Sequence, residues 1–158
     1  MRGAGDGRYT SGWYRPAMST ETIHGACLCG AVEYEADGPF AGFQYCHCSR
    51  CRRFTGSAHA ANLFCPPAQF RFTKGEANVG RYALPDARFF ATSFCRTCGS
   101  SLPWLNQAGT TVIIPAGTLD DAPSVRPARN IMWGSRAPWY VEASELEKHD
   151  ELPPRKGK

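Results

Sequence analysis

Short runs of apolar residues, several of them alternating with polar residues, recur along most of the chain. They lie at 31–36, 42–46, 60–65, 69–73, 79–84, 88–94 and 110–116, and Gly, Pro, Asn or Asp residues bound them. Within 31–36, Val32 and Tyr34 fall on one face and Glu33 and Glu35 on the other, as in a half-buried antiparallel strand. The pattern predicts a mainly β domain with many turns.

Few positions favour a helix. Helical patterns occur only at 49–54 and at 143–149, and the second pattern spans no more than about two turns. At 158 residues the chain has the usual size of one domain. We expect this domain to span 18–152, with a flexible Gly- and Arg-rich extension at 1–17 before it and a basic tail at 153–158 after it.

Charge and apolar content disfavour two classes of partner. The formal charge is +4, but the two tails hold six of the basic residues and only one acidic residue, Asp6. Removing these seven leaves 12 basic and 13 acidic residues, so we expect no basic nucleic-acid-binding surface. No apolar run reaches the roughly eighteen residues of a membrane span, and no signal peptide is recognisable. We therefore expect a cytoplasmic protein with no membrane partner.

The strongest chemical signal is the spacing of the cysteines. The eight are Cys27, Cys29, Cys46, Cys48, Cys51, Cys65, Cys95 and Cys98. A disulfide framework is one interpretation, but it requires a secreted chain. Zinc is favoured because residues two apart on a strand, or three apart in a turn, can place two sulfurs about 2.3 Å from one ion. Gly99, directly after Cys98, suits a tight metal-binding turn because glycine tolerates positive φ.

Seven of these cysteines divide into a set of four and a set of three. Cys27, Cys29, Cys95 and Cys98 would close a structural zinc site. Cys46, Cys48 and Cys51 would form a second zinc site whose fourth position is filled by water, a side chain or a substrate, as in catalytic zinc sites. Cys65 is expected to be a buried apolar residue. His47 is expected to point away from the ligands beside it, at the surface or behind the metal site.

Several stretches of the chain resemble one known family, in the right order over about residues 22 to 141. They are GACLCGAVEYE, CHCSRCRRFTGSAHAAN, FRFTKGE, FCRTCGSSLP, AGTLDD and SRAPWY. They resemble the glutathione-dependent formaldehyde-activating enzyme family, which also contains centromere protein V. The resemblance implies a β-tent fold related to methionine-R-sulfoxide reductase, two zinc ions per chain, and a carbon-sulfur lyase that forms S-hydroxymethylglutathione. One departure is Asn130, where the family pattern has a His before the Ile.

The implied substrate is a small thiol, glutathione first. Arg50, Arg52 and Arg53 flank the three-cysteine site and are candidate contacts for its carboxylates, although they could be ordinary solvated charges. Thr55, Gly56 and Ser57 could supply donors or simply form a turn. Two other functions stay open: a non-catalytic binding module stabilised by zinc, and a related enzyme acting on another thiol adduct. Sulfoxide reduction is disfavoured because Cys65 is the only spare thiol.

Overall fold

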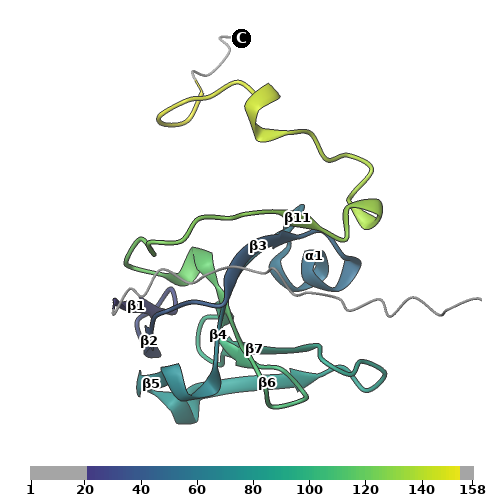
Figure 1. The fold of residues 1–158 in the computed structure, drawn as a ribbon. Coiled ribbons are helices and arrows are strands. Elements are labelled where there is room, and N and C mark those ends of the chain that lie inside the picture. The colour runs from purple at the N-terminus through teal and green to yellow at the C-terminus, as the bar shows by residue number, and fades with distance from the viewer. Residues whose placement is uncertain (1–20, 154–158) are drawn as a thin grey trace, which may run out of the picture.

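The fold consists of three small β-sheets joined by short turns (Figure 1). The computed structural model describes residues 21–153, so the expected extension at 1–17 and nearly all of the expected tail at 153–158 lie outside the described residues. The strands are β1 (Thr22–Ala26), β2 (Glu33–Asp37), β3 (Gly42–Cys46), β4 (Ala60–Cys65), β5 (Phe70–Lys74), β6 (Val79–Ala83), β7 (Ala91–Cys95), β8 (Ser101–Leu102), β9 (Trp104–Leu105), β10 (Val112–Pro115) and β11 (Asn130–Ile131). The helical elements are α1 (Ser49–Thr55) and the 3₁₀ turns η1 (Pro67–Gln69), η2 (Glu76–Asn78), η3 (Ala116–Thr118), η4 (Trp133–Ser135) and η5 (Ala143–Glu145).

The first sheet has the order β1-β2-β5, and its pairings are antiparallel. The alternation predicted at 31–36 is present: Val32 and Tyr34 are buried, whereas Glu33 and Glu35 are only partly buried. The buried face joins the main core with Ile23 of β1. All seven runs that predicted strands contain or overlap a strand, so the mainly β prediction is confirmed.

The second sheet has the order β11-β3-β4-β10-β9 and carries the three-cysteine segment. It is antiparallel except for the parallel pair of β11 with β3. One of its faces contributes Leu63, Cys65 and Ile114 to the core, each with no exposed surface. The prediction that Cys65 is a buried apolar residue is therefore confirmed, and burial raises the pKa of its thiol to about 12.

The third sheet has the order β6-β7-β8, and its strand β7 ends at Cys95. The turn from Cys95 to Gly99 closes with a hydrogen bond from the Gly99 N–H to the Cys95 carbonyl at 2.9 Å. Gly99 has φ of 75°, the left-handed conformation that its position in the sequence predicted.

The helical predictions had different outcomes. The helix predicted at 49–54 is present as α1, and Gly56 ends it in a left-handed conformation. The helix predicted at 143–149 is wrong, because only the single 3₁₀ turn η5 forms there. All residues of 141–153 are exposed, so no buried face stabilises a helix that would be marginal by itself. In Figure 1 this yellow segment extends away from the sheets.

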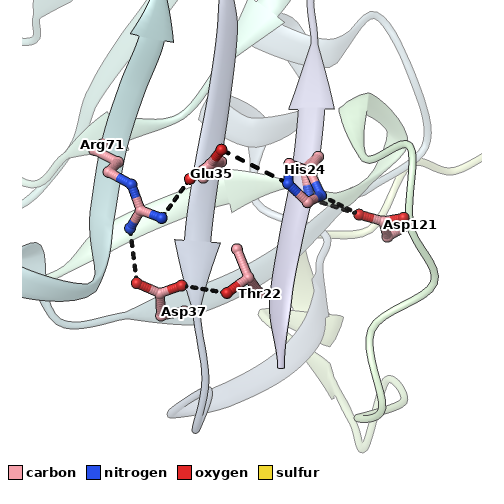
Figure 2. A network of polar contacts seen from close by, with 6 residues as sticks. All are labelled: Thr22, His24, Glu35, Asp37, Arg71 and Asp121. Carbon is pink, nitrogen blue, oxygen red and sulfur yellow. Dashed lines mark hydrogen bonds and ion pairs between the residues drawn. The ribbon is translucent and has the colours of Figure 1, made fainter. Parts of the chain in front are cut away.

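A network of polar side chains crosses the exposed face of the first sheet (Figure 2). His24 Nδ1 is 2.8 Å from Asp121 Oδ2, which also accepts from the His24 backbone N–H. Arg71 of β5 donates to both Glu35 and Asp37 of β2. The network therefore links β1 to β5 and to the segment after η3.

No helix among the described residues is long and apolar enough to cross a membrane.

Candidate metal centre

Three cysteines converge where β3 passes into α1. Cys46 is the last residue of β3, Cys48 is the N-cap of α1, and Cys51 lies in the first turn of that helix. Their Sγ atoms lie within 4.8 Å of one another. The Cys51 N–H donates to Cys48 Sγ at 3.4 Å, so the sulfur replaces the oxygen of a usual helix cap. The local chain geometry alone thus gathers the three thiols.

The three thiols influence one another electrostatically. A hydrogen bond between the Cys46 and Cys51 thiols lowers the pKa of Cys46 to about 6 and raises the pKa of Cys51. The backbone N–H of Cys48 also lowers the pKa of Cys46. The thiolate is the form that binds metal, and the same hydrogen bond makes Cys46 the more acidic and Cys51 the less acidic thiol of the pair.

Four further cysteines meet between the first and third sheets. Cys27 and Cys29 follow β1, Cys95 ends β7 and Cys98 follows it, and their Sγ atoms lie within 4.8 Å of one another. The Sγ of Cys29 is 3.6 Å from that of Cys27 and 3.9 Å from that of Cys95. Four sulfurs around a tetrahedral zinc lie about 3.8 Å apart, so this set fits zinc in number, donor type and distance.

Neighbouring donors support the sulfurs of this four-cysteine cluster. The Val32 N–H donates to Cys27 Sγ at 3.3 Å, and Asn78 Nδ2 donates to Cys95 Sγ at 3.5 Å. The backbone N–H and the hydroxyl of Ser100 lower the pKa of Cys98 to about 6. Such contacts orient metal ligands and stabilise their thiolate form.

The three-cysteine cluster differs because it borders a cavity of about 570 Å³. Cys46 and Cys51 are 6% and 7% exposed, and both contribute to the cavity lining. Among the described residues, no fourth His, Cys, Asp or Glu completes this group. The donor set fits a zinc ion held by three thiolates, and two of the three cysteines border the cavity.

The three predicted arginines occupy different environments. Arg50 borders the cavity. Arg52 donates through Nε to the His47 carbonyl at 3.3 Å, and Arg53 is exposed. Arg88, which belongs to none of the cysteine motifs, borders the same cavity from the segment before β7. No motif spacing identifies Arg88, because the fold brings it to the site from a distant part of the sequence.

Thr55, Gly56 and Ser57 form the end of α1 and the turn that follows it, so the second of the two alternatives holds. Thr55 donates its hydroxyl to the Cys51 carbonyl at 2.9 Å, and the Gly56 N–H donates to the Arg52 carbonyl at 2.9 Å. Ser57 is exposed. None of these three borders the 570 Å³ cavity.

His47 lies between two cysteines of the three-cysteine cluster in the sequence, but it is not one of the candidate metal ligands. The alternative that placed it at the surface is wrong, because it has no exposed surface. Three rings surround it with centroids 4.9 to 5.2 Å away, those of Trp133, His59 and Tyr140. Its Nε2 is 2.9 Å from Oδ1 of Asn130, the residue at which the chain departs from the family pattern. The segment after β11, which the sequence pattern did not predict, covers this histidine.

Comparisons with known proteins agree with this geometry. The chain is similar in structure to a Rhodobacter sphaeroides protein known from a crystal structure, with 25% sequence identity and a TM-score of 0.55. The similarity covers 68% of this chain and 98% of the other. No curated protein matches the chain. The model of the family described as glutathione-dependent formaldehyde-activating enzyme matches residues 22–135. The chain therefore belongs to the glutathione-dependent formaldehyde-activating enzyme family.

Proposed function

We propose that the protein is a zinc-dependent carbon-sulfur lyase that binds glutathione or a related small thiol beside Cys46, Cys48 and Cys51. It would form or cleave an adduct of this thiol with a carbonyl compound, such as S-hydroxymethylglutathione. The observation that carries this proposal is a cluster of three thiols that borders a cavity. The chain also has a separate cluster of four thiols, which is enough to fill the coordination shell of a zinc ion. Membership of the family supports the type of reaction.

The seven clustered cysteines would bind the metal ions in this proposal. Cys46, Cys48 and Cys51 would hold one zinc ion, and Cys27, Cys29, Cys95 and Cys98 would hold the other. A bound zinc supplies positive charge that lowers the pKa of a thiol brought next to it. Addition of the thiol to the carbonyl forms a carbon-sulfur bond, and the carbonyl oxygen takes up the proton that the sulfur loses.

The cavity would orient the rest of the substrate. Arg50 and Arg88 border it and can pair with the carboxylates of glutathione. Arg52 and Arg53 do not line the cavity, and Arg52 donates to the His47 carbonyl instead. Apolar side chains form much of the remaining wall and reduce contact with water. The volume of about 570 Å³ is in the range of small-molecule sites and exceeds what formaldehyde alone requires. The second candidate is a related enzyme acting on another thiol adduct, which a cavity of this size could also hold.

Three further expectations belong to this proposal. We infer the β-tent fold related to methionine-R-sulfoxide reductase, supported by three small sheets and a four-cysteine cluster between the first and third of them. A cytoplasmic location belongs to the same proposal, because seven thiols that serve as metal ligands must stay reduced. The charge outside the tails supports a small-molecule partner over nucleic acid.

The direct test is exchange of formaldehyde with S-hydroxymethylglutathione, followed by NMR with the zinc-loaded protein. The rate should exceed the spontaneous rate, since thiol and formaldehyde also combine unaided. Cys51→Ser should return the rate to the spontaneous value. If wild-type protein gives no acceleration with this pair or with larger aldehydes, the enzymatic proposal fails and a zinc-stabilised binding module takes its place.

A further inference from the structure

One face of the second sheet forms the floor of the 570 Å³ cavity. Residues two apart on a strand share a face, and paired residues on neighbouring strands lie side by side. Gln44 therefore shares a face with Cys46, and Asn62 of β4 pairs with Gln44 in register. All three residues line the cavity. The floor continues through the apolar residues Phe64, Ile113 and Trp104.

Asn62 is an unusual residue for this position. It is 9% exposed and lies on a strand whose opposite face is part of the core. Within residues 21–153, neither its side-chain amide nor that of Gln44 makes a hydrogen bond to another residue. By contrast, Asn106 lines the same cavity but uses its amide locally, donating to Thr110 Oγ1 at 3.0 Å and accepting from the Thr110 N–H at 2.9 Å.

The unused amides determine which ligand groups can replace water in the cavity. A primary amide both donates and accepts, and leaving it unpaired beside a bound ligand weakens binding. A carboxylate offers only acceptors, so the guanidinium groups of Arg50 and Arg88 are better partners for it than the two side-chain amides. A secondary amide offers one donor and one acceptor that point in opposite directions. Two side-chain amides with Cβ atoms about 5 Å apart can therefore bind its two sides.

We propose that Gln44 and Asn62 form an amide-recognition subsite, which selects thiols that carry a secondary amide close to the sulfur. This inference rests on the proposed function, in which the thiol sulfur binds beside Cys46. Gln44 precedes Cys46 by two residues on β3, so the subsite begins about 7 Å along the strand from the cysteine. In cysteine-containing peptides two carbons separate the sulfur from an amide nitrogen, so these two atoms lie no more than about 4 Å apart, and a hydrogen bond of about 3 Å to a side chain of the subsite covers the rest of this spacing.

Two probes that differ only at the amide test the subsite. N-acetylcysteamine carries a thiol and a secondary amide, and 2-mercaptoethyl acetate has an ester oxygen in place of the N–H. Their dissociation constants would be measured by calorimetry on the zinc-loaded full chain, with 2-mercaptoethanol as a thiol that carries neither group. We expect the amide to bind about tenfold more tightly than the ester, because the ester leaves an amide oxygen of the protein unpaired.

Two variants locate the effect. Asn62→Leu and Gln44→Met keep approximately the same volume but remove the amides, so the preference for the amide probe should fall to less than about twofold. The affinity for 2-mercaptoethanol should stay within about twofold of wild type. Gln69→Met is the matched control, because Gln69 does not line the cavity, and it should keep the wild-type preference. If Asn62→Leu does not fold, Gln44→Met tests the half-buried member of the pair alone.

The outcomes separate this inference from the proposed function. Equal binding of the amide and ester probes by wild-type protein would overturn the amide-recognition subsite while leaving thiol binding intact. An amide preference that persists in both variants would overturn the assignment to Gln44 and Asn62. If wild-type protein binds none of the three thiols, the proposed function itself fails and the subsite fails with it.

Discussion

At the residue scale, Gly25 of β1 lies where an added side chain would meet Tyr34 and Thr118. A Cβ atom there would lie 2.3 Å from the Tyr34 hydroxyl oxygen and 2.5 Å from the Thr118 backbone oxygen. Tyr34 is itself buried and hydrogen-bonded to Thr118 at 2.7 Å, so it has little room to move. The identity of this residue is therefore set by packing.

Gly25→Ala should consequently destabilise the fold by about 1 to 3 kcal/mol, the usual cost of overpacking. Thermal unfolding measures the change. Gly117→Ala is the matched control, since nothing lies within 4 Å of the Cβ it would add, and its melting temperature should stay near that of wild type. Equal melting temperatures for wild type and Gly25→Ala would contradict the packing described for β1.

The His24 contact should make stability depend on pH. Hydrogen bonding to Asp121, with the charges of Asp121, Glu35 and Asp120, raises the pKa of His24 above 6.5 in the folded protein. Because the folded-state pKa is raised, the stabilisation is present below about pH 6.5 and is lost as the pH rises through the folded-state value. The same contact lowers the pKa of Asp121 below 3.8, so the pair also weakens under strongly acidic conditions.

The melting temperature of His24→Gln should therefore be below that of wild type at about pH 5.5, and the gap should shrink towards about pH 8.5. Arg71 lies on the far side of Glu35 and keeps its charge throughout this range. His149→Gln, which alters a histidine outside this network, is the control. A gap that is constant or grows with pH would contradict the assigned contact.

At the element scale, the two cysteine clusters would have different structural tasks. A metal ion in the four-cysteine cluster would tie the turn after β1 to the turn after β7, and no disulfide joins these turns among the described residues. The three-cysteine cluster lies within one segment, from the end of β3 to the first turn of α1. Losing a ligand should therefore matter more for folding in the first cluster than in the second.

We expect Cys98→Ser to unfold or aggregate, because structural zinc contributes directly to folding free energy. Cys51→Ser should keep its circular dichroism spectrum and a cooperative thermal transition while it loses one zinc ion and its activity. Metal content would be measured by elemental analysis after purification. A Cys98→Ser protein with wild-type stability would show that the four-cysteine cluster is not a structural site.

Local sequence signals predicted some elements well because those elements depend on local contacts. The alternation before and within β2, the boundaries of β3 and β4, and the convergence of Cys46, Cys48 and Cys51 follow from strand periodicity and turn spacing. The short strands β8, β9 and β11 carry no such signal, since two residues cannot show a period. The helix predicted at 143–149 failed because a helix needs a packing partner that this segment lacks.

The cavity could not be predicted, because it is assembled from distant segments. Arg88 reaches it from before β7, and Asn62 reaches it from β4 beside Gln44 of β3. The role of Asn62 follows only from register and burial, because an asparagine within an apolar run looks like an ordinary break in the pattern. His47 was expected to point away from the neighbouring cysteines, but two of the rings that surround it, those of Trp133 and Tyr140, follow β11 in the sequence.

At the scale of the whole molecule, the two clusters predict a fixed metal content. Seven cysteines in sets of four and three should bind two zinc ions per chain, with Cys65 excluded because it is buried apart from both sets. Prolonged treatment with a strong chelator should remove both ions and abolish the cooperative thermal transition, since metal binding and folding are coupled. A fully loaded chain that contains a single zinc ion would contradict the division into two sites.

The central claim is that the three-cysteine site accepts the sulfur of a substrate thiol. Cobalt substituted for zinc gives an absorption spectrum that reports the donors around each metal, and the four-cysteine site contributes a constant background. Adding glutathione at up to about 1 mM should change this spectrum, because a fourth sulfur joins the Cys46, Cys48 and Cys51 set. S-methylglutathione, which cannot present an anionic sulfur, should leave it unchanged, as should glutathione added to Cys51→Ser. A wild-type spectrum that glutathione does not alter, in a protein that holds both cobalt ions, would contradict the account.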